Sequence, residues 1–253
     1  MNKMKVIILA AGEGKRLRPY TQDRPKCMVE IEGVTLIDRQ IEVLKSVGLN
    51  DILIIGGYKA DMLRRTDTKL KINPRYQETN MVWTLFCAEE ELSGDIVISY
   101  GDIVYSKEIL QKLISSDSDI SITIDKDWEN YWSARSENPL ADAETLKLSD
   151  DGLVSEIGKK PQSINEIDGQ YMGLMKFSSH GIKQLKSVFH MALKTGELGG
   201  KALASSYMTD LLQSAINTGY SVQSVPVFGG WVEIDTVEDL ESPVTKDRIN
   251  SIK

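Results

Sequence analysis

The chain begins with an apolar run that leads directly into a loop of glycines and cations, and this feature restricts the fold most. Val6–Ala11 has the length of a strand buried on both faces, and Gly12–Pro19 reads GEGKRLRP. In open α/β sheets ligands bind where such a strand ends. Glycines let backbone N–H groups approach an anion and the cations add positive charge, so the loop predicts a phosphate site. The loop lacks the third glycine of the dinucleotide fingerprint and the Gly-Lys-Ser/Thr sequence of the Walker loop, so it is neither of these motifs. The alternative to a phosphate site is an ordinary turn.

Apolar strands and helical periodicity alternate along the rest of the chain, which predicts an α/β, Rossmann-like fold with a mixed, mainly parallel central sheet flanked by helices. The expected strands are residues 6–11, 51–57, 70–73, 96–100, 120–124, 171–177, 222–227 and 229–235, with a hairpin at 146–148 and 154–157. The expected helices lie near residues 37–47, 80–92, 109–114, 179–194 and 206–218, with Asn80 as an N-cap. Residues 126–142 break this pattern, and we expect a loop or short helix that forms a small lid on the substrate side.

We expect a single domain over residues 1–253, because no linker, repeat or low-complexity segment divides the chain. A chain of 253 residues is long enough to bury a sizeable core as one unit. The nucleotide-binding half is expected mainly at 1–125 and the acceptor-binding half mainly at 126–235. Residues 236–253 are expected to be a C-terminal helix or tail.

The composition narrows the set of partners. The formal net charge is −7, which argues against general nucleic-acid binding. No apolar run is long enough to span a bilayer, and the apolar start lacks a signal-peptide cleavage site, so we expect a cytoplasmic protein without a membrane partner. Two cysteines without a CxxC pattern predict neither a disulfide framework nor a zinc site. Two histidines make a histidine-centred catalytic triad unexpected.

Three charged residues outside the loop stand where chemistry is expected. Lys26 follows shortly after the glycine-rich loop, and lysine is a compact cation suited to one phosphate. Asp102 and Asp235 each follow an apolar strand, so their carboxylates can converge on a Mg²⁺ ion at one edge of the sheet. The alternatives are a solvated surface lysine and aspartates that cap helices or turns.

The segments Leu9–Thr21 (LAAGEGKRLRPYT) and Pro25–Val29 (PKCMV) resemble the signature of nucleotidyltransferases that activate small phosphorylated compounds. That family includes sugar-1-phosphate nucleotidylyltransferases and bacterial phosphocholine cytidylyltransferases. The segments Asn80–Leu85 (NMVWTL), Tyr207–Asp210 (YMTD) and Trp231–Asp235 (WVEID) resemble its cytidylyltransferase branch, most of all the phosphoglutamine enzymes of capsule modification. Residues 156–161 (EIGKKP) resemble the family's Glu-Lys-Pro segment with two residues inserted, which makes the match of Lys160 less secure.

The resemblance implies a Mg²⁺-dependent transfer of CMP from CTP to a small phosphate or phosphonate, with release of pyrophosphate. The attacking phosphate is already an anion, so no general base is required. The implied catalytic residues are Lys26, Arg16 and Asp102, and the implied metal ligands are Asp102 and Asp235. The implied nucleotide site consists of Ala10, Ala11, Gly12, Gly14, Lys15 and Arg16, with Asn80 and Thr84 expected to read the base.

The acceptor is expected to be a small amine or amino-acid phosphate, because the segment after the fifth strand combines aromatic rings with charged groups. We interpret residues 126–144 as too polar and irregular to be core, and Arg135 as a partner for an acceptor carboxylate or phosphate. The residues expected at the acceptor site are Lys126, Trp128, Asp142, Glu144, Lys160, Tyr171 and Glu233. A sugar-1-phosphate nucleotidylyltransferase and a non-catalytic nucleotide-binding regulator remain as alternatives, and a homodimer is left open.

Overall fold

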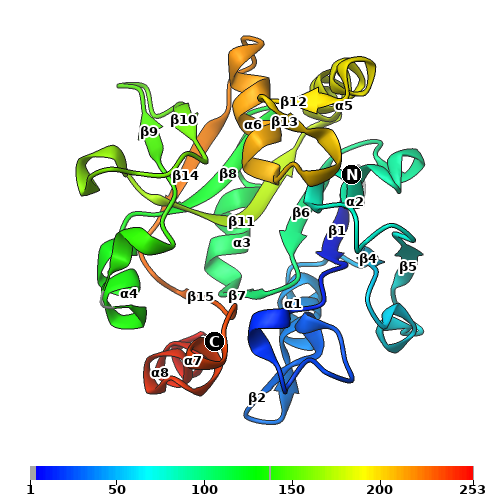
Figure 1. Ribbon diagram of the computed structural model, residues 1–253, viewed down its shortest axis with the longest axis vertical. Coiled ribbons are helices and arrows are strands. Elements are labelled where there is room, and N and C mark those ends of the chain that lie inside the picture. The colour runs from blue at the N-terminus through cyan, green and yellow to red at the C-terminus, as the bar shows by residue number, and fades with distance from the viewer. Residues whose placement is uncertain (1–3, 137, 253) are drawn as a thin grey trace.

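The computed structural model describes residues 4–136 and 138–252, so residues 1–3, Glu137 and Lys253 of the predicted domain lie outside the described ranges. A seven-stranded sheet forms its centre (Figure 1). Its strands, in spatial order, are β14 (Gln223–Val227), β8 (Ile120–Asp125), β11 (Gln170–Phe177), β6 (Ile96–Tyr100), β1 (Lys5–Ala10), β4 (Asp51–Gly56) and β5 (Lys69–Ile72). Only β11 runs antiparallel to its neighbours in this sheet, which confirms the mixed, mainly parallel arrangement.

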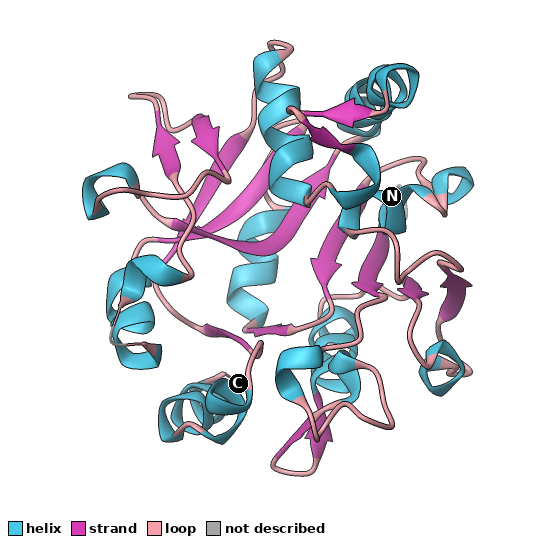
Figure 2. Cartoon of the chain, viewed as in Figure 1, coloured by secondary structure: helices cyan, strands magenta, loops and turns pink. Residues whose placement is uncertain are grey.

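Successive side chains of the central strand enter the cores on opposite faces of the sheet, as the pleat requires. Val6 and Ile8 of β1 belong to one buried cluster, and Ile7 and Leu9 belong to the other. Helices α1 (Leu36–Ser46) and α3 (Lys107–Ile114) contribute to the first cluster. The second cluster takes apolar side chains from α2 (Met81–Phe86), α5 (Ser179–Thr195) and α6 (Met208–Asn217), so helices flank both faces (Figure 2).

Helix α2 is shorter than the sequence pattern predicts. Asn80 caps it as expected, but the helix ends at Phe86 and a 3₁₀ turn, η4 (Glu89–Glu91), follows. Three consecutive glutamates at a helix C-terminus oppose the helix dipole, which accounts for the early end. The other 3₁₀ turns are η1 (Lys15–Leu17), η2 (Lys26–Met28), η3 (Ala60–Leu63), η5 (Pro139–Ala141), η6 (Ile164–Glu166) and η7 (Leu203–Ser205).

Short two-stranded ribbons complete the fold, and one of them positions the site. Strand β15 (Trp231–Glu233) pairs antiparallel with β7 (Ile103–Tyr105), and the N–H of Ile234 donates to the carbonyl of Asp102 at 3.0 Å. This pairing brings the segment before Asp235 to the end of β6. The other ribbons are the predicted hairpin β9 (Leu146–Leu148) and β10 (Val154–Ile157), β2 (Glu30–Ile31) with β3 (Val34–Thr35), and β12 (Glu197–Leu198) with β13 (Lys201–Ala202).

The segment expected to form a loop or short helix contains helix α4 (Trp128–Arg135), but the expectation that it lies outside the core is wrong. Trp128, Tyr131 and Trp132 are all buried in the first core cluster, where Tyr131 packs edge-on against Trp231 with ring centroids 5.6 Å apart. Spacing of three and four residues places these rings on one face of a helix, and burial of that face fixes α4 to the sheet.

The C-terminal segment forms α7 (Val237–Glu241) and α8 (Pro243–Ser251), which lie near the β15–β7 ribbon at one end of the molecule (Figure 1). Within the described ranges, none of the helices combines the length and apolar character that a bilayer crossing requires.

Candidate active site

A cleft of about 860 Å³ opens at the carboxyl ends of β1 and β6. These two strands are parallel neighbours, so the loops that follow them meet at the same edge of the sheet. Segments from both predicted halves of the chain line the cleft. The predicted residues found there are Ala10, Ala11, Gly12, Gly14, Lys15, Arg16, Lys26, Asn80, Thr84, Asp102, Asp142, Glu144, Tyr171, Glu233 and Asp235.

The glycine-rich loop packs closely against the segment that carries Lys26. Gly14 has φ +64°, and a Cβ atom there would lie 3.0 Å from Cβ of Lys26 and 3.1 Å from Cγ2 of Thr21. The hydroxyl of Thr21 donates to the carbonyl of Gly14 at 2.7 Å. Both the backbone angle and the space therefore require glycine at position 14. Arg16 follows in η1, and its side chain is 60% exposed, so a ligand in the cleft can reach its guanidinium.

Lys26 lies between the two strand-end aspartates that the sequence singles out. Its Nζ donates to Oδ2 of Asp102 at 2.6 Å and to Oδ1 of Asp235. Arg16 donates to the second oxygen of Asp235 at 2.7 Å. Burial opposes the charge on Lys26, but Asp102, Asp235 and the nearby Glu233 raise the pKa of this lysine above its ordinary value. The ammonium therefore stays protonated and acts as the internal counter-ion of the carboxylates.

Glu233 adds a third carboxylate to this group. One oxygen atom from each of Asp102, Glu233 and Asp235 lies within 4.8 Å of the others. Burial, and then the neighbouring charge of Asp235, raise the pKa of Glu233 to about 8. Burial also works against ionisation of Asp235, but Lys26 and Arg16 hold the pKa of Asp235 below its ordinary value. The cluster thus crowds three carboxyl groups beside the glycine-rich loop, where Asp235 ionises readily and Glu233 tends to keep its proton.

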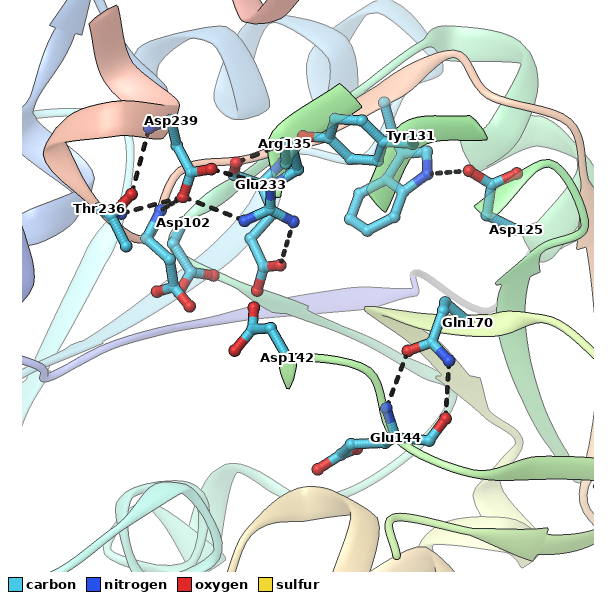
Figure 3. Close-up of polar contacts among 12 residues, drawn as sticks. Asp102, Asp125, Tyr131, Arg135, Asp142, Glu144, Gln170, Glu233, Thr236 and Asp239 are labelled. Carbon is cyan, nitrogen blue, oxygen red and sulfur yellow. Dashed lines mark hydrogen bonds and ion pairs between the residues drawn. The ribbon is translucent and has the colours of Figure 1, made fainter. Parts of the chain in front are cut away.

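The opposite wall of the cleft carries Glu144 and aromatic rings. The side chain of Gln170 holds the backbone of Glu144 from both sides, accepting from its N–H at 3.2 Å and donating to its carbonyl at 2.6 Å (Figure 3). Burial and then the charge of Asp210 raise the pKa of Glu144 to about 6. The rings of Tyr100 and Tyr171 meet edge-on with centroids 5.7 Å apart. This wall can receive a small cationic or amphipathic group.

Four residues expected to contact the acceptor do not lie in the cleft lining. Trp128 is buried in the core, and Lys126 is exposed beyond the end of β8. Lys160 donates to the carbonyls of Leu140 and Ala141, so it stabilises a loop rather than facing the cleft. Arg135 is 8% exposed and is paired with protein carboxylates. The structure does not support an acceptor-binding role for these residues.

Other lining residues were absent from the predicted site. Tyr100 and Gln170 lie in the wall, and Gln77 and Thr79 line the cleft just before α2. Trp132, one of the aromatic rings expected near the acceptor, also lines the cleft. A signal was available for both residues, because Tyr100 ends one predicted strand and Gln170 directly precedes another. Gln77 and Thr79 lie in a segment without periodicity, which gave no such signal.

Comparison with known proteins identifies relatives over most of the chain. A model described as a MobA-like NTP transferase domain matches residues 6–158. The CTP:phosphoglutamine cytidylyltransferase of Campylobacter jejuni is 42% identical over 254 residues, which cover 96% of this chain and 100% of that protein. The choline-phosphate cytidylyltransferase of Streptococcus pneumoniae is 39% identical over 117 residues, which cover 45% of this chain and 51% of that protein.

Solved structures share the fold at low sequence identity. The inositol-1-phosphate CTP transferase from T. maritima gives a TM-score of 0.76 at 22% identity and covers 100% of this chain and 98% of that chain. The CTP:phosphocholine cytidylyltransferase from Streptococcus pneumoniae gives 0.70 at 24% identity, with 94% and 96% covered. The family model covers more than half of the chain, and the Campylobacter relative is similar along its whole length. This protein therefore belongs to the family of MobA-like NTP transferases.

Proposed function

We propose that this chain transfers CMP from CTP to a small phosphorylated or phosphonate acceptor that carries an amino or quaternary ammonium group, with release of pyrophosphate, and that phosphoglutamine is the first acceptor to test. The observation that carries the proposal is Lys26, which is held between Asp102 and Asp235 beside the glycine-rich loop that lines the cleft. The names of the Campylobacter and Streptococcus relatives support cytidylyl transfer to a phosphorylated amino acid or amine.

The nucleotide fits the half of the cleft that the glycine-rich loop forms. Backbone N–H groups near Gly12 and Gly14 and the exposed cations Lys15 and Arg16 suit a triphosphate. The base fits between the end of β1 and the start of α2. Thr84 already accepts from the side-chain amide of Asn73 at 3.0 Å, which leaves its hydroxyl proton to read the base edge.

The carboxylates of Asp102 and Asp235 fit a Mg²⁺ ion, which prefers one or two carboxylates together with phosphate oxygens. Among the described residues, Oδ1 of Asp102 is buried without a hydrogen-bond partner. A buried carboxylate oxygen without a donor needs another positive partner, and a cation supplies it. When bound, Mg²⁺ supplies charge neutralisation to phosphate oxygens at the reacting centre.

The reaction we propose needs positioning and charge rather than proton transfer. An acceptor phosphate oxygen forms a bond to the α-phosphorus of CTP, and the bond from that phosphorus to the bridging oxygen of the β-phosphate breaks. The electron pair leaves with pyrophosphate. Lys26 offsets the repulsion between the two anions, and Arg16 contacts the departing pyrophosphate. No histidine lines the cleft within the described ranges, which agrees with a reaction that requires no base.

The acceptor fits the wall formed by Glu144, Tyr171 and Trp132. A carboxylate and aromatic faces together suit an ammonium group, whereas a sugar is better served by neutral hydrogen-bonding groups. Asp142 lies at the mouth, 4.0 Å from Arg16, between the two halves of the cleft. A CDP-linked product is a suitable donor for modifying a surface polysaccharide or lipid, and CTP consumption places the proposed reaction in the cytoplasm.

The test is pyrophosphate release with each of the four NTPs against phosphoglutamine, phosphocholine, aminoethylphosphonate and a sugar 1-phosphate. We expect CTP with an amino-bearing phosphate to give the highest kcat/KM. Faster turnover with a sugar 1-phosphate would replace the proposal with the sugar-nucleotide alternative. CTP binding by calorimetry without turnover on any acceptor would favour the non-catalytic regulator.

A further inference from the structure

Asp239 on α7 links the candidate active site to helix α4. Its Oδ2 accepts the backbone N–H groups of Asp235 and Thr236, both at 3.0 Å. The N–H of Asp239 in turn donates to the hydroxyl of Thr236 at 3.1 Å, which completes a capping box. Figure 3 shows the bonds of Asp239 to Thr236 and to Arg135. This one buried carboxylate therefore also holds the backbone of Asp235, whose side chain contacts Lys26.

Arg135 binds the same carboxylate from the other side. Its Nε lies 2.8 Å from Oδ1 of Asp239 and one Nη 3.0 Å from Oδ2, and the other Nη lies 3.3 Å from Glu233. The guanidinium also lies over the rings of Tyr131 and Trp132, 5.1 and 5.2 Å from their centroids. Burial opposes the charge, but the pKa of Arg135 is raised by its bond to Asp239 and by the charge of Glu233.

A helix cap alone does not account for this arrangement. Asp38 occupies the corresponding third position of α1, where Thr35 is the N-cap, the Thr35 hydroxyl bonds to the Asp38 carboxylate, and Arg65 is the cationic partner. The side chain of Asp38 is 47% exposed, whereas that of Asp239 is 7% exposed. Burying an ion pair is costly and adds little net stability compared with apolar packing. On α7 the buried carboxylate also accepts the backbone N–H of Asp235, a residue of the charged cluster, which lies outside the helix that Asp239 caps.

We propose that Asp239 and Arg135 are positioning residues that fix the Asp235 and Glu233 carboxylates in the orientation required for the nucleotide and its cation. The pair does not touch substrate in this arrangement and acts through the backbone at Asp235. Without this pair the Asp235 carboxylate can rotate away from the cleft. Removing the pair should therefore weaken cation binding and lower turnover more than it lowers the stability of the fold. This inference rests on the proposed function. Each variant is therefore compared with the unmodified enzyme, using the nucleotide and acceptor that give the unmodified enzyme its highest turnover.

The experiment compares Asp239→Asn and Arg135→Met with two matched controls. Asp38→Asn removes the charge of the equivalent cap on α1. Arg248→Met removes a second guanidinium from the same aromatic cluster, since the Arg248 guanidinium lies 3.9 Å from the ring centroid of Tyr131. Its carboxylate partner is Asp125, 3.9 Å away, and not Asp239 or Glu233. The readouts are kcat, KM for CTP, melting temperature, and the dissociation constant of Mn²⁺ with CTP present and acceptor absent.

We expect Asp239→Asn and Arg135→Met each to lower kcat by roughly 10- to 100-fold and to weaken Mn²⁺ binding by about tenfold, as for partners of metal ligands. The double variant should lose little more than either single variant, because one unit is being broken. Arg135→Lys should recover part of kcat. The controls should keep kcat and Mn²⁺ binding even where the melting temperature falls. Equal losses in the controls, or losses that follow melting temperature alone, would overturn the inference. An unmodified enzyme without turnover on any substrate would instead contradict the proposed function.

Discussion

Replacing Lys26 by methionine tests the charge balance of the cleft, because it keeps most of the side-chain stem and removes the ammonium. The Lys26 and Asp235 side chains are each 15% exposed, so both charges are largely shielded from water. The carboxylate oxygens of the cluster lie within 4.8 Å of one another, and two unit charges at that limit repel each other by about 3.5 kcal/mol at an effective dielectric constant of roughly 20. Removing one partner of a buried ion pair costs about 3–5 kcal/mol, which agrees with that figure.

We therefore expect Lys26→Met to lower the free energy of unfolding by about 3 kcal/mol in metal-free buffer near neutral pH. Lys26 holds the pKa of Asp235 below 3.8, so this contribution is present above that pH and is lost as the pH falls through the lowered value. Mg²⁺ should raise the melting temperature of the variant more than that of the unmodified protein, since a cation can replace the ammonium.

Turnover of Lys26→Met should fall by about 10²–10³-fold, as for the loss of a charged group at a reacting centre. The assay is pyrophosphate release at saturating CTP, combined with thermal unfolding with and without Mg²⁺. An unchanged kcat with a raised KM for CTP would mean that Lys26 only binds the ground state. An unchanged melting temperature in metal-free buffer would refute the charge argument.

Three further changes give expected outcomes. Asp102→Asn and Asp235→Asn should each abolish Mg²⁺-dependent pyrophosphate release while the variants stay folded; a capping role predicts a lower melting temperature with normal activity per folded molecule. Gly14→Ala should cost about 1–2 kcal/mol through its left-handed backbone and also raise KM for CTP. Gly33→Ala is the control, because Gly33 has φ +77° with open space around it. This variant should lose a similar amount of stability without a change in KM for CTP. KM for an amino-bearing acceptor should fall about tenfold between about pH 5 and pH 7 as Glu144 ionises near 6, and this fall should vanish in Glu144→Gln. Titration of the acceptor itself affects the unmodified enzyme and Glu144→Gln equally, so it cancels when their pH profiles are compared. If acceptor KM depends on pH in the same way in both enzymes, Glu144 does not belong to the acceptor site.

The sheet and the phosphate loop were predictable because their signals are local. An apolar run of strand length followed by glycines and cations occupies only residues 6–19, and strand alternation fixes the α/β class. Lys26, Asp102 and Asp235 were also identified, since each stands just after a loop or strand that has to reach the carboxyl edge of the sheet. The structure brings these three side chains into contact.

The errors came from patterns that were read too locally. Trp128, Tyr131 and Trp132 have the spacing of one helical face, which predicts burial, but the charges and the Asn-Pro pair across residues 126–142 suggested a lid outside the core. The pairing of Arg135 with Asp239 joins positions 104 residues apart and has no local signal at all. Such contacts depend on where β15 pairs, and β7 was not among the predicted strands.

The ammonium of Lys26 has enough N–H groups to hydrogen-bond to two carboxylates and to a phosphate at the same time. A protonated lysine carries three N–H groups, and two of them are directed at Asp102 and Asp235. The third can therefore meet a phosphate oxygen without release of the aspartates. Two carboxylates fix the position of an otherwise flexible side chain, which reduces the ordering required when the anions arrive. Lys26 is thus oriented before substrate binds, and the aspartates that hold it are the same residues that fit the cation.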